Sequence, residues 1–187
     1  MFDWNFFKRT SSISATVITT IPLGLDASYR LLGTSEGHER IAGGSRLAKV
    51  VKLQEQDYVS LQNGQTLESA NVIEQAAADI PPTRYRRQHF LLQEEVPLAF
   101  GFKTTIYISG ALTWDVQALS TEPLAAPIHA LYESRTTTGI PVSVRKLRVF
   151  ETMQGEELQT RVTEHIEIRF PSLLRFIIEP IALKDHR

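Results

Sequence analysis

The sequence predicts an α+β domain in which a curved antiparallel β-sheet is closed by a C-terminal helix. Apolar and polar residues alternate along most of the chain, as in strands that bury only one face. Glycine and proline clusters divide this pattern into strand-length segments. Near the C-terminus the apolar spacing becomes helical. With 187 residues, 42% of them hydrophobic, the chain is expected to form a single domain over residues 1–187.

The first part of the chain predicts a strand followed by two short helices. Residues 13–21 alternate β-branched with small polar side chains, which is typical of a strand. Asp26 is a suitable N-cap for a short helix over residues 27–32. A second helical turn is expected at residues 38–41, before a pair of glycines ends this part.

The segment that follows is harder to interpret. Residues 46–61 predict a second strand. In residues 66–80 the apolar side chains recur near helical spacing and alanine is frequent, so the sequence favours a helix, with a strand as the alternative. Two prolines end this segment in either case.

A long run of strands and a closing helix complete the pattern. The predicted strands cover residues 88–98, 104–116, 128–138, 142–153 and 158–170. Pro171 suits the first turn of a helix, and the apolar residues from Leu173 to Ile181 then recur on one helical face. Pro180 is expected to kink or end this helix.

Several stretches resemble a known superfamily. They are VPL at residues 96–98 with Gly110 and Trp114-Asp115, HALYES at 129–134, VRKLR at 144–148, TRVTE at 160–164, and residues 171–178. Together with the order of elements, they are similar to uncharacterised fungal members of the START-like (SRPBCC) superfamily. The resemblance implies a helix-grip fold with two short helices after the first strand, a cavity for a small molecule and natural-product chemistry. A lipocalin-like barrel and a cone-shaped cyclase fold are the alternatives.

Two glutamates are the candidate catalytic residues. Alternation assigns Glu94 and Glu164 to otherwise apolar faces of their strands. A carboxylate in an apolar cavity has a raised pKa and can act as a general acid or base near neutral pH. The alternative is structural, with a solvent-exposed strand end or a β-bulge that reverses the face.

The candidate substrate-binding residues would line the same cavity. Trp114 and Tyr132 combine an aromatic ring with one polar atom, which suits the orientation of an apolar ligand by a single hydrogen bond. Either face of residues 128–135 could point inward, so His129 is also a candidate. The apolar candidates are Phe90, Ile106, Ile108, Leu112, Ile166, Leu174 and Ile178.

Composition argues against other classes of protein. The chain has no cysteine, its five histidines lack metal-ligand spacing, and neither a phosphate-binding loop nor a serine nucleophile motif is present, so no metal or cofactor is expected. A net charge of −1 argues against a nucleic-acid partner. No apolar run is long enough to span a bilayer, and residues 13–25 are too polar for a signal peptide, so we expect a cytoplasmic protein.

The sequence therefore favours a protein that binds an apolar small molecule. The leading hypothesis is a cofactor-free cyclase, similar to polyketide cyclases or pericyclases, acting on a polyketide or terpenoid intermediate. The alternatives are a carrier of a lipid, sterol or pigment, and an interaction domain with a filled core. The four aromatic residues of the N-terminal arm, residues 1–10, are expected to pack on the domain or on a second subunit, which makes a homodimer one expectation.

Overall fold

The computed structural model describes residues 10–37, 48–61, 65–78, 85–97, 103–118, 127–153 and 156–175. The strands are β1 (Thr10–Ile21), β2 (Ala48–Val59), β3 (Tyr85–Pro97), β4 (Lys103–Asp115), β5 (Ile128–Thr136), β6 (Ser143–Met153) and β7 (Glu156–Pro171). The helix α1 (Leu25–Leu32) follows β1, and the short 3-10 helix η3 (Ser172–Leu174) follows β7. Within these ranges, no helix is long and apolar enough to cross a membrane.

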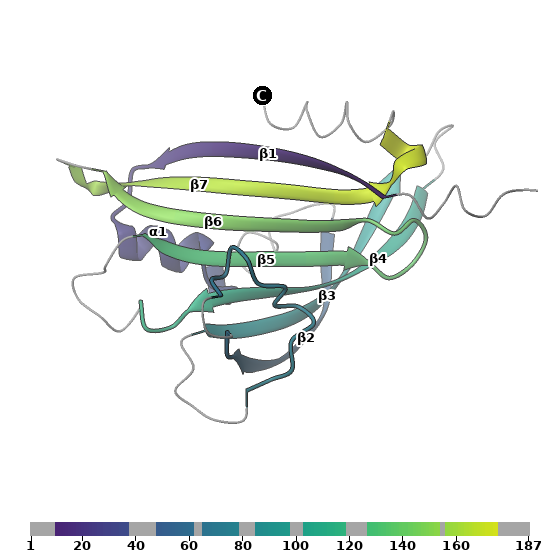
Figure 1. Cartoon of the computed structure of the whole chain (residues 1–187), viewed down its shortest axis with the longest axis horizontal. Coiled ribbons are helices and arrows are strands. Elements are labelled where there is room, and N and C mark those ends of the chain that lie inside the picture. The colour runs from purple at the N-terminus through teal and green to yellow at the C-terminus, as the bar shows by residue number, and fades with distance from the viewer. Residues whose placement is uncertain are drawn as a thin grey trace, which may run out of the picture.

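The seven strands form one antiparallel sheet in the order β1-β7-β6-β5-β4-β3-β2. Strands from β2 to β7 each pair with their neighbours in sequence, and β1 returns to pair with β7 over its whole length, from Thr10 opposite Pro171 to Ile21 opposite Thr160. The sheet is twisted and curved, and α1 crosses its far side in the view of Figure 1. Residues 65–78, which we call the strap, cross the near side.

The prediction of an α+β helix-grip fold is wrong. The described chain is dominated by its sheet, and α1 is a helix of only 8 residues. One reason is that residues 66–80 were counted as a helix, whereas their described part contains none. In addition, strands β1, β3 and β7 are longer than predicted, and β7 alone has 16 residues. The predicted second helical turn at residues 38–41 and most of the predicted closing helix lie outside the described residues, which end in η3 and Arg175.

The strap was predicted to be a helix, and it has no regular helix or strand. Its polar side chains bind nearby groups: the Thr66 amide donates to Ser69 Oγ at 3.1 Å, and Asn71 Nδ2 donates to Glu74 Oε2 at 3.2 Å. Such local bonds compete with helical hydrogen bonds. The helical spacing of the apolar residues therefore did not predict the structure of this segment. The strap is held by contacts with side chains of neighbouring strands.

Helix α1 begins at Leu25, two residues earlier than the sequence predicts. Gly24 is the N-cap, with extended backbone and no side-chain cap bond, and Asp26 lies in the first turn instead of capping it. There its carboxylate is favoured by the helix dipole and accepts a hydrogen bond from Arg30 Nε at 2.9 Å. The buried side of the helix carries Leu25, Ser28 and Tyr29.

The sheet has a hydrophobic core on each face. On one side, α1 packs on a cluster that comprises Leu112, Trp114, Ile128, Ala130, Phe150 and Val162 together with Leu25 and Tyr29. The Tyr29 ring meets the Phe150 ring edge-on, with centroids 5.2 Å apart. On the other side, the strap residues Leu67, Ala70 and Val72 pack on Val59, Leu131 and Leu147. The central strand β5 is therefore covered on both faces.

Candidate functional site

Most of the predicted site residues lie on the face that carries α1, which we call the α1 face. Residues paired across neighbouring strands share a face, and the stacked rings of Phe90 and Tyr132 link β3 to β5 on this side. The predicted residues found here are Phe90, Glu94, Ile106, Ile108, Leu112, Trp114, Tyr132, Glu164 and Ile166. Both candidate glutamates are thus on one face, with Glu94 on β3 and Glu164 on β7.

The α1 face has two parts. One is covered by α1 and filled by the core beneath the helix, and the other lies beyond α1. Leu112 and Trp114, 2% and 3% exposed, belong to the core beneath α1, so they support the helix. Further along the face, Phe90, Leu92 and Ile166 are also buried, while Ile106 and Ile108 are half-buried. We call this second part the apolar wall; its apolar residues come from β3, β4 and β7.

Three predicted residues are not part of this group. His129 lies between Ile128 and Ala130 in β5, so alternation turns its side chain to the opposite face, beside the cross-strand residue Val149. The side chain of Leu174 and the whole of Ile178 lie outside the described residues.

Three charged side chains form a cluster in the apolar wall. Arg148 Nε donates a hydrogen bond to Glu164 Oε1, and Lys146 Nζ lies 3.7 Å from Glu164 Oε2. The side chains of Lys146, Glu164 and Arg148 are 28%, 21% and 16% exposed. Arg148 Nη1 also donates to the carbonyl oxygen of Leu32 at 2.5 Å, which satisfies a carbonyl at the C-terminal end of α1. The cluster therefore connects the sheet to the helix.

The charges of the cluster decide its protonation. Burial alone would raise the pKa of Glu164, but the Arg148 guanidinium and the Lys146 ammonium hold that pKa below its usual value. The predicted raised pKa of Glu164 is therefore wrong, because the sequence does not show which charges β6 brings beside it. Burial lowers the pKa of Lys146; Glu164 opposes this change and Arg148 adds to it. The cluster combines a persistent carboxylate with an amine that is deprotonated more easily than an exposed lysine.

An aromatic pair lies next to the cluster. The rings of Phe90 and Tyr132 are stacked with centroids 5.4 Å apart and an interplanar angle of 20°. Tyr132 pairs across the strands with Lys146. Burial raises the pKa of the Tyr132 phenol, the hydrogen bond with Ser134 lowers it, and the Glu94 carboxylate raises it further, with a net increase. Tyr132 therefore keeps its proton and can donate a hydrogen bond.

Glycine at position 110 makes room for this pair. A glycine inside a strand often marks a bulge, but β4 pairs regularly at Gly110, opposite Phe90 on one side and Ser134 on the other. A Cβ atom at this position would lie 2.3 Å from Phe90 Cζ and 2.7 Å from the backbone oxygen of Glu133. The missing side chain is what allows the Phe90 ring to lie across β4.

Sequence reasoning did not identify Lys146 and Arg148 as site residues. Their signal was present in β6, where they alternate with Leu147 and lie between the apolar residues Val144 and Phe150 of the same face. Two cations on such a face require an anionic partner, and Glu164 is opposite Arg148 in the pairing of β6 with β7. The register of β6 against β7 brings these residues together, and it cannot be read from the local sequence pattern of either strand.

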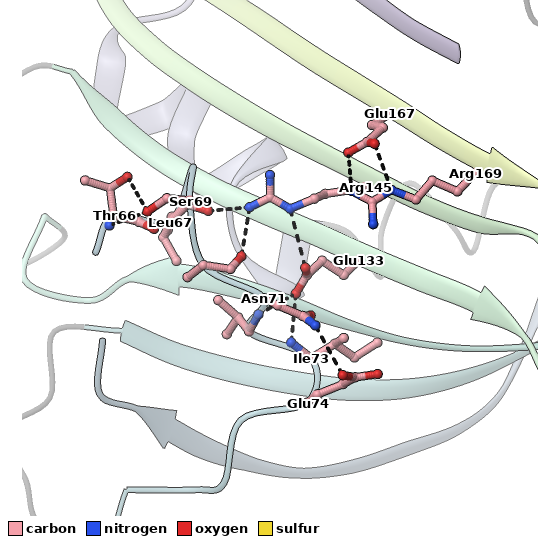
Figure 2. Close-up of polar contacts among 12 residues, drawn as sticks. Thr66, Leu67, Ser69, Asn71, Ile73, Glu74, Glu133, Arg145, Glu167 and Arg169 are labelled. Atoms are coloured by element: carbon pink, nitrogen blue, oxygen red, sulfur yellow. Dashed lines mark hydrogen bonds and ion pairs between the residues drawn. The ribbon is translucent and has the colours of Figure 1, made fainter. Parts of the chain in front are cut away.

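Two grooves that are lined by described residues lie on the opposite face. One of about 430 Å³ lies between the strap and the strands β5, β6 and β7, and a second of about 250 Å³ continues toward β1. Charged side chains line the larger groove and pair with one another, and Figure 2 shows the pairs Arg145–Glu133 and Arg169–Glu167. The pairs are Arg145–Glu133 at 3.5 Å, Arg135–Glu74 at 3.2 Å and Arg169–Glu167 at 2.7 Å.

These charges hold the strap in place. Arg145 Nη2 donates to the carbonyl oxygens of Leu67 and Ala70 at 2.6 and 3.0 Å, and Glu133 Oε2 accepts from the amides of Val72 and Ile73 at 3.1 and 2.8 Å (Figure 2). We therefore assign them a structural role and take the α1 face as the candidate site. In the described ranges, no group of three histidine, aspartate or glutamate side chains could hold a metal ion.

No protein-family model matches this chain, and no similar sequence is found among curated proteins. The resemblance to the START-like superfamily thus receives no support from these comparisons. Any function has to be argued from the chemistry of the α1 face.

Proposed function

We propose that the α1 face binds a largely apolar small molecule with an oxygen-containing polar group, and that the protein acts on it as a cofactor-free cyclase. A polyketide or terpenoid intermediate is the expected substrate class. The observation that carries this proposal is the cluster of Lys146, Arg148 and Glu164 in an otherwise apolar wall. Charges are rarely kept in such surroundings unless they pair or act on a ligand.

The cluster has the chemistry that a cyclisation needs. A cyclase holds a flexible substrate so that its reacting atoms are close, and this alone removes much of the entropic barrier. Lys146 and Arg148 can stabilise negative charge that develops on a carbonyl oxygen, and the neutral phenol of Tyr132 can donate a hydrogen bond to it. The Phe90–Tyr132 pair offers a flat surface for a planar or unsaturated part of the substrate.

A carrier of a lipid, sterol or pigment is the alternative. It would use the same apolar wall, with Phe90, Leu92 and Ile166 as its contacts. For simple carriage, however, a partly buried group of two cations and a carboxylate offers little advantage and carries a desolvation penalty. The charged cluster is thus the feature that favours the enzyme over the carrier.

The first experiment is native mass spectrometry of the purified full chain, with organic extraction of any bound molecule. An apolar compound with a carbonyl or carboxyl group is the expected result, and binding of a panel of apolar fluorescent dyes provides a second measurement. The variant Glu164→Gln should weaken the binding of the extracted compound. The matched control is Glu167→Gln, on the same strand but the opposite face, which should bind normally.

Two further results decide between the hypotheses. If Glu94→Gln and Glu164→Gln leave the extracted compound unchanged even at concentrations that compensate for weaker binding, while the unmodified chain converts it, the protein is an enzyme. If the unmodified chain never changes the compound, the carrier is correct. An empty protein that binds no dye would contradict both and favour an interaction domain.

A further inference from the structure

Lys146 has surroundings that set it apart from an ordinary surface lysine. Its side chain is 28% exposed and extends from β6 on the α1 face, between its cross-strand neighbours Tyr132 and Ile166. Lys52 of β2 is the other lysine whose side chain the structure describes, and it is exposed. Of these two lysines, Lys146 is therefore the one whose amine lies at the apolar wall.

The carboxylate beside Lys146 is already engaged by a second cation. Glu164 Oε1 accepts a hydrogen bond from Arg148, so only Oε2, at 3.7 Å, faces the Lys146 amine. Arg148 also repels a charged ammonium at Lys146, while burial in the wall removes water that would stabilise it. The amine thus has one anionic partner, at 3.7 Å and shared with Arg148, and an apolar surface around it. Such surroundings favour a neutral, nucleophilic lysine.

We propose that Lys146 Nζ is a nucleophile that forms an imine with a ketone or aldehyde group of the ligand held on the α1 face. This inference rests on the proposed function and names the reactive group of its substrate. In the first step, the nitrogen lone pair attacks the carbonyl carbon, the carbon–oxygen π electrons move to oxygen, and one proton passes from nitrogen to that oxygen. The product is a carbinolamine.

The second step releases water. The hydroxyl group takes up a proton and leaves as water, the nitrogen forms a double bond to carbon and loses its last proton, and Glu164 Oε2 is the nearest acceptor for that proton. Amine and carbonyl thus give imine and water, and neither an oxidant nor a reductant is consumed. Protonation of the imine nitrogen gives an iminium ion. The iminium withdraws electrons from the adjacent carbon, which favours loss of a proton there and the carbon–carbon bond formation that a cyclase requires.

Reductive trapping tests this proposal. The full chain is incubated near neutral pH with hexanal, a small apolar aldehyde, and sodium cyanoborohydride, and the modified lysines are identified by peptide mass spectrometry. Lys146 should be labelled faster than Lys52 by about tenfold or more, because the apolar wall would hold the aldehyde close to the Lys146 amine. The variant Lys146→Met should lose this label and keep a native circular dichroism spectrum.

The possible results distinguish a failure of the imine proposal from a failure of the proposed binding function. Equal labelling of Lys146 and Lys52 would overturn the imine proposal, and if apolar dyes still bind, the proposed binding function survives that result. Preferential labelling of Lys146 that an excess of a bound apolar dye suppresses supports both. If neither dye nor hexanal engages the α1 face, the proposed function itself is wrong.

Discussion

The hydroxyl group of Tyr29 joins α1 to two strands where they separate. The side chain is fully buried, its oxygen accepts a hydrogen bond from the Asp115 amide at 2.8 Å, and its proton is shared between the carbonyl oxygens of Asp115 and His129, each 3.2 Å away. These backbone groups lie at the end of the β4–β5 pairing, where the ladder no longer satisfies them.

Removing this hydroxyl should destabilise the protein. We expect Tyr29→Phe to lower the free energy of unfolding by about 1–3 kcal/mol, because it leaves a buried amide without its acceptor. Urea denaturation measures the change. Tyr107→Phe is the control, since the Tyr107 side chain is exposed, and it should change stability little. Equal losses in the two variants would show that the Tyr29 hydroxyl has no special role.

The close approach at Gly110 leads to a second prediction. Gly110→Ala should lower the free energy of unfolding by about 1–3 kcal/mol, because the added methyl group overlaps the Phe90 ring and the Glu133 backbone oxygen. Adding Phe90→Leu in the alanine background should recover part of the loss, since it removes one of the two clashes. A double-mutant cycle by urea denaturation tests this coupling, and simple additivity of the two changes would contradict it.

At the scale of single residues, the sequence predicts faces better than it predicts chemistry. Alternation indicates that Glu164 points to an apolar face, and its pairing with the residues of β6 agrees with that face. It cannot indicate that Arg148 and Lys146 are beside it, because the register of β6 against β7 depends on the whole sheet. The local sequence therefore could not predict that the pKa of Glu164 is lowered.

The strap is the element where local pattern and structure differ most. Its apolar residues are spaced almost as in a helix, but three strands of the sheet, β3, β5 and β6, supply charged side chains that bind its backbone. Arg87 Nη1 donates to the carbonyl oxygens of Val72 and Gln75 at 2.5 and 2.8 Å, and Arg145 and Glu133 bind other backbone groups. Backbone groups that a helix would pair internally are thus satisfied from outside.

This arrangement predicts an unusual dependence of stability on pH. Burial raises the pKa of Glu133, although the amides of Ile73 and Val72 and the Arg145 guanidinium oppose the increase. Between the ordinary pKa of the unfolded chain and the raised pKa of the fold, the folded protein binds more protons than the unfolded one. The contribution of Glu133 to stability is therefore greatest below the ordinary pKa and is lost as pH rises through the raised pKa.

The variant Glu133→Gln removes this titration. As pH rises from about 4 to about 7, the unfolding free energy of the unmodified protein should fall relative to that of the variant. Urea denaturation of both proteins at several pH values measures the difference. Glu74→Gln is the control, because its carboxylate is exposed and its ion pair with Arg135 is a surface pair of small effect. A relative rise for the unmodified protein would contradict the assignment.

For the whole molecule, the positions of the strands can be predicted from local sequence patterns, but the fold class cannot. The predicted strand 158–170 is close to β7, Glu156–Pro171, and the predicted strand 13–21 is close to β1, Thr10–Ile21, because β-branched alternation marks both. The balance between helix and sheet was misjudged because the strap was counted as a helix. How far a segment depends on distant strands cannot be read from its own residues.

The sheet order predicts where the molecule is most resistant to opening. Strand β5 pairs on both sides, and α1 and the strap cover its two faces, so Ile128, Ala130 and Leu131 are at most 2% exposed. Strand β2 ends the described sheet, its pairing with β3 has two irregularities, and Lys52, Leu53 and Gln54 are exposed. Hydrogen exchange measured by mass spectrometry or NMR should therefore be slowest in β5 and much faster in β2, because the edge can open without breaking either core. Equal protection of the two strands would mean that the sheet opens only as a whole, and that the two cores on its faces do not set its local stability.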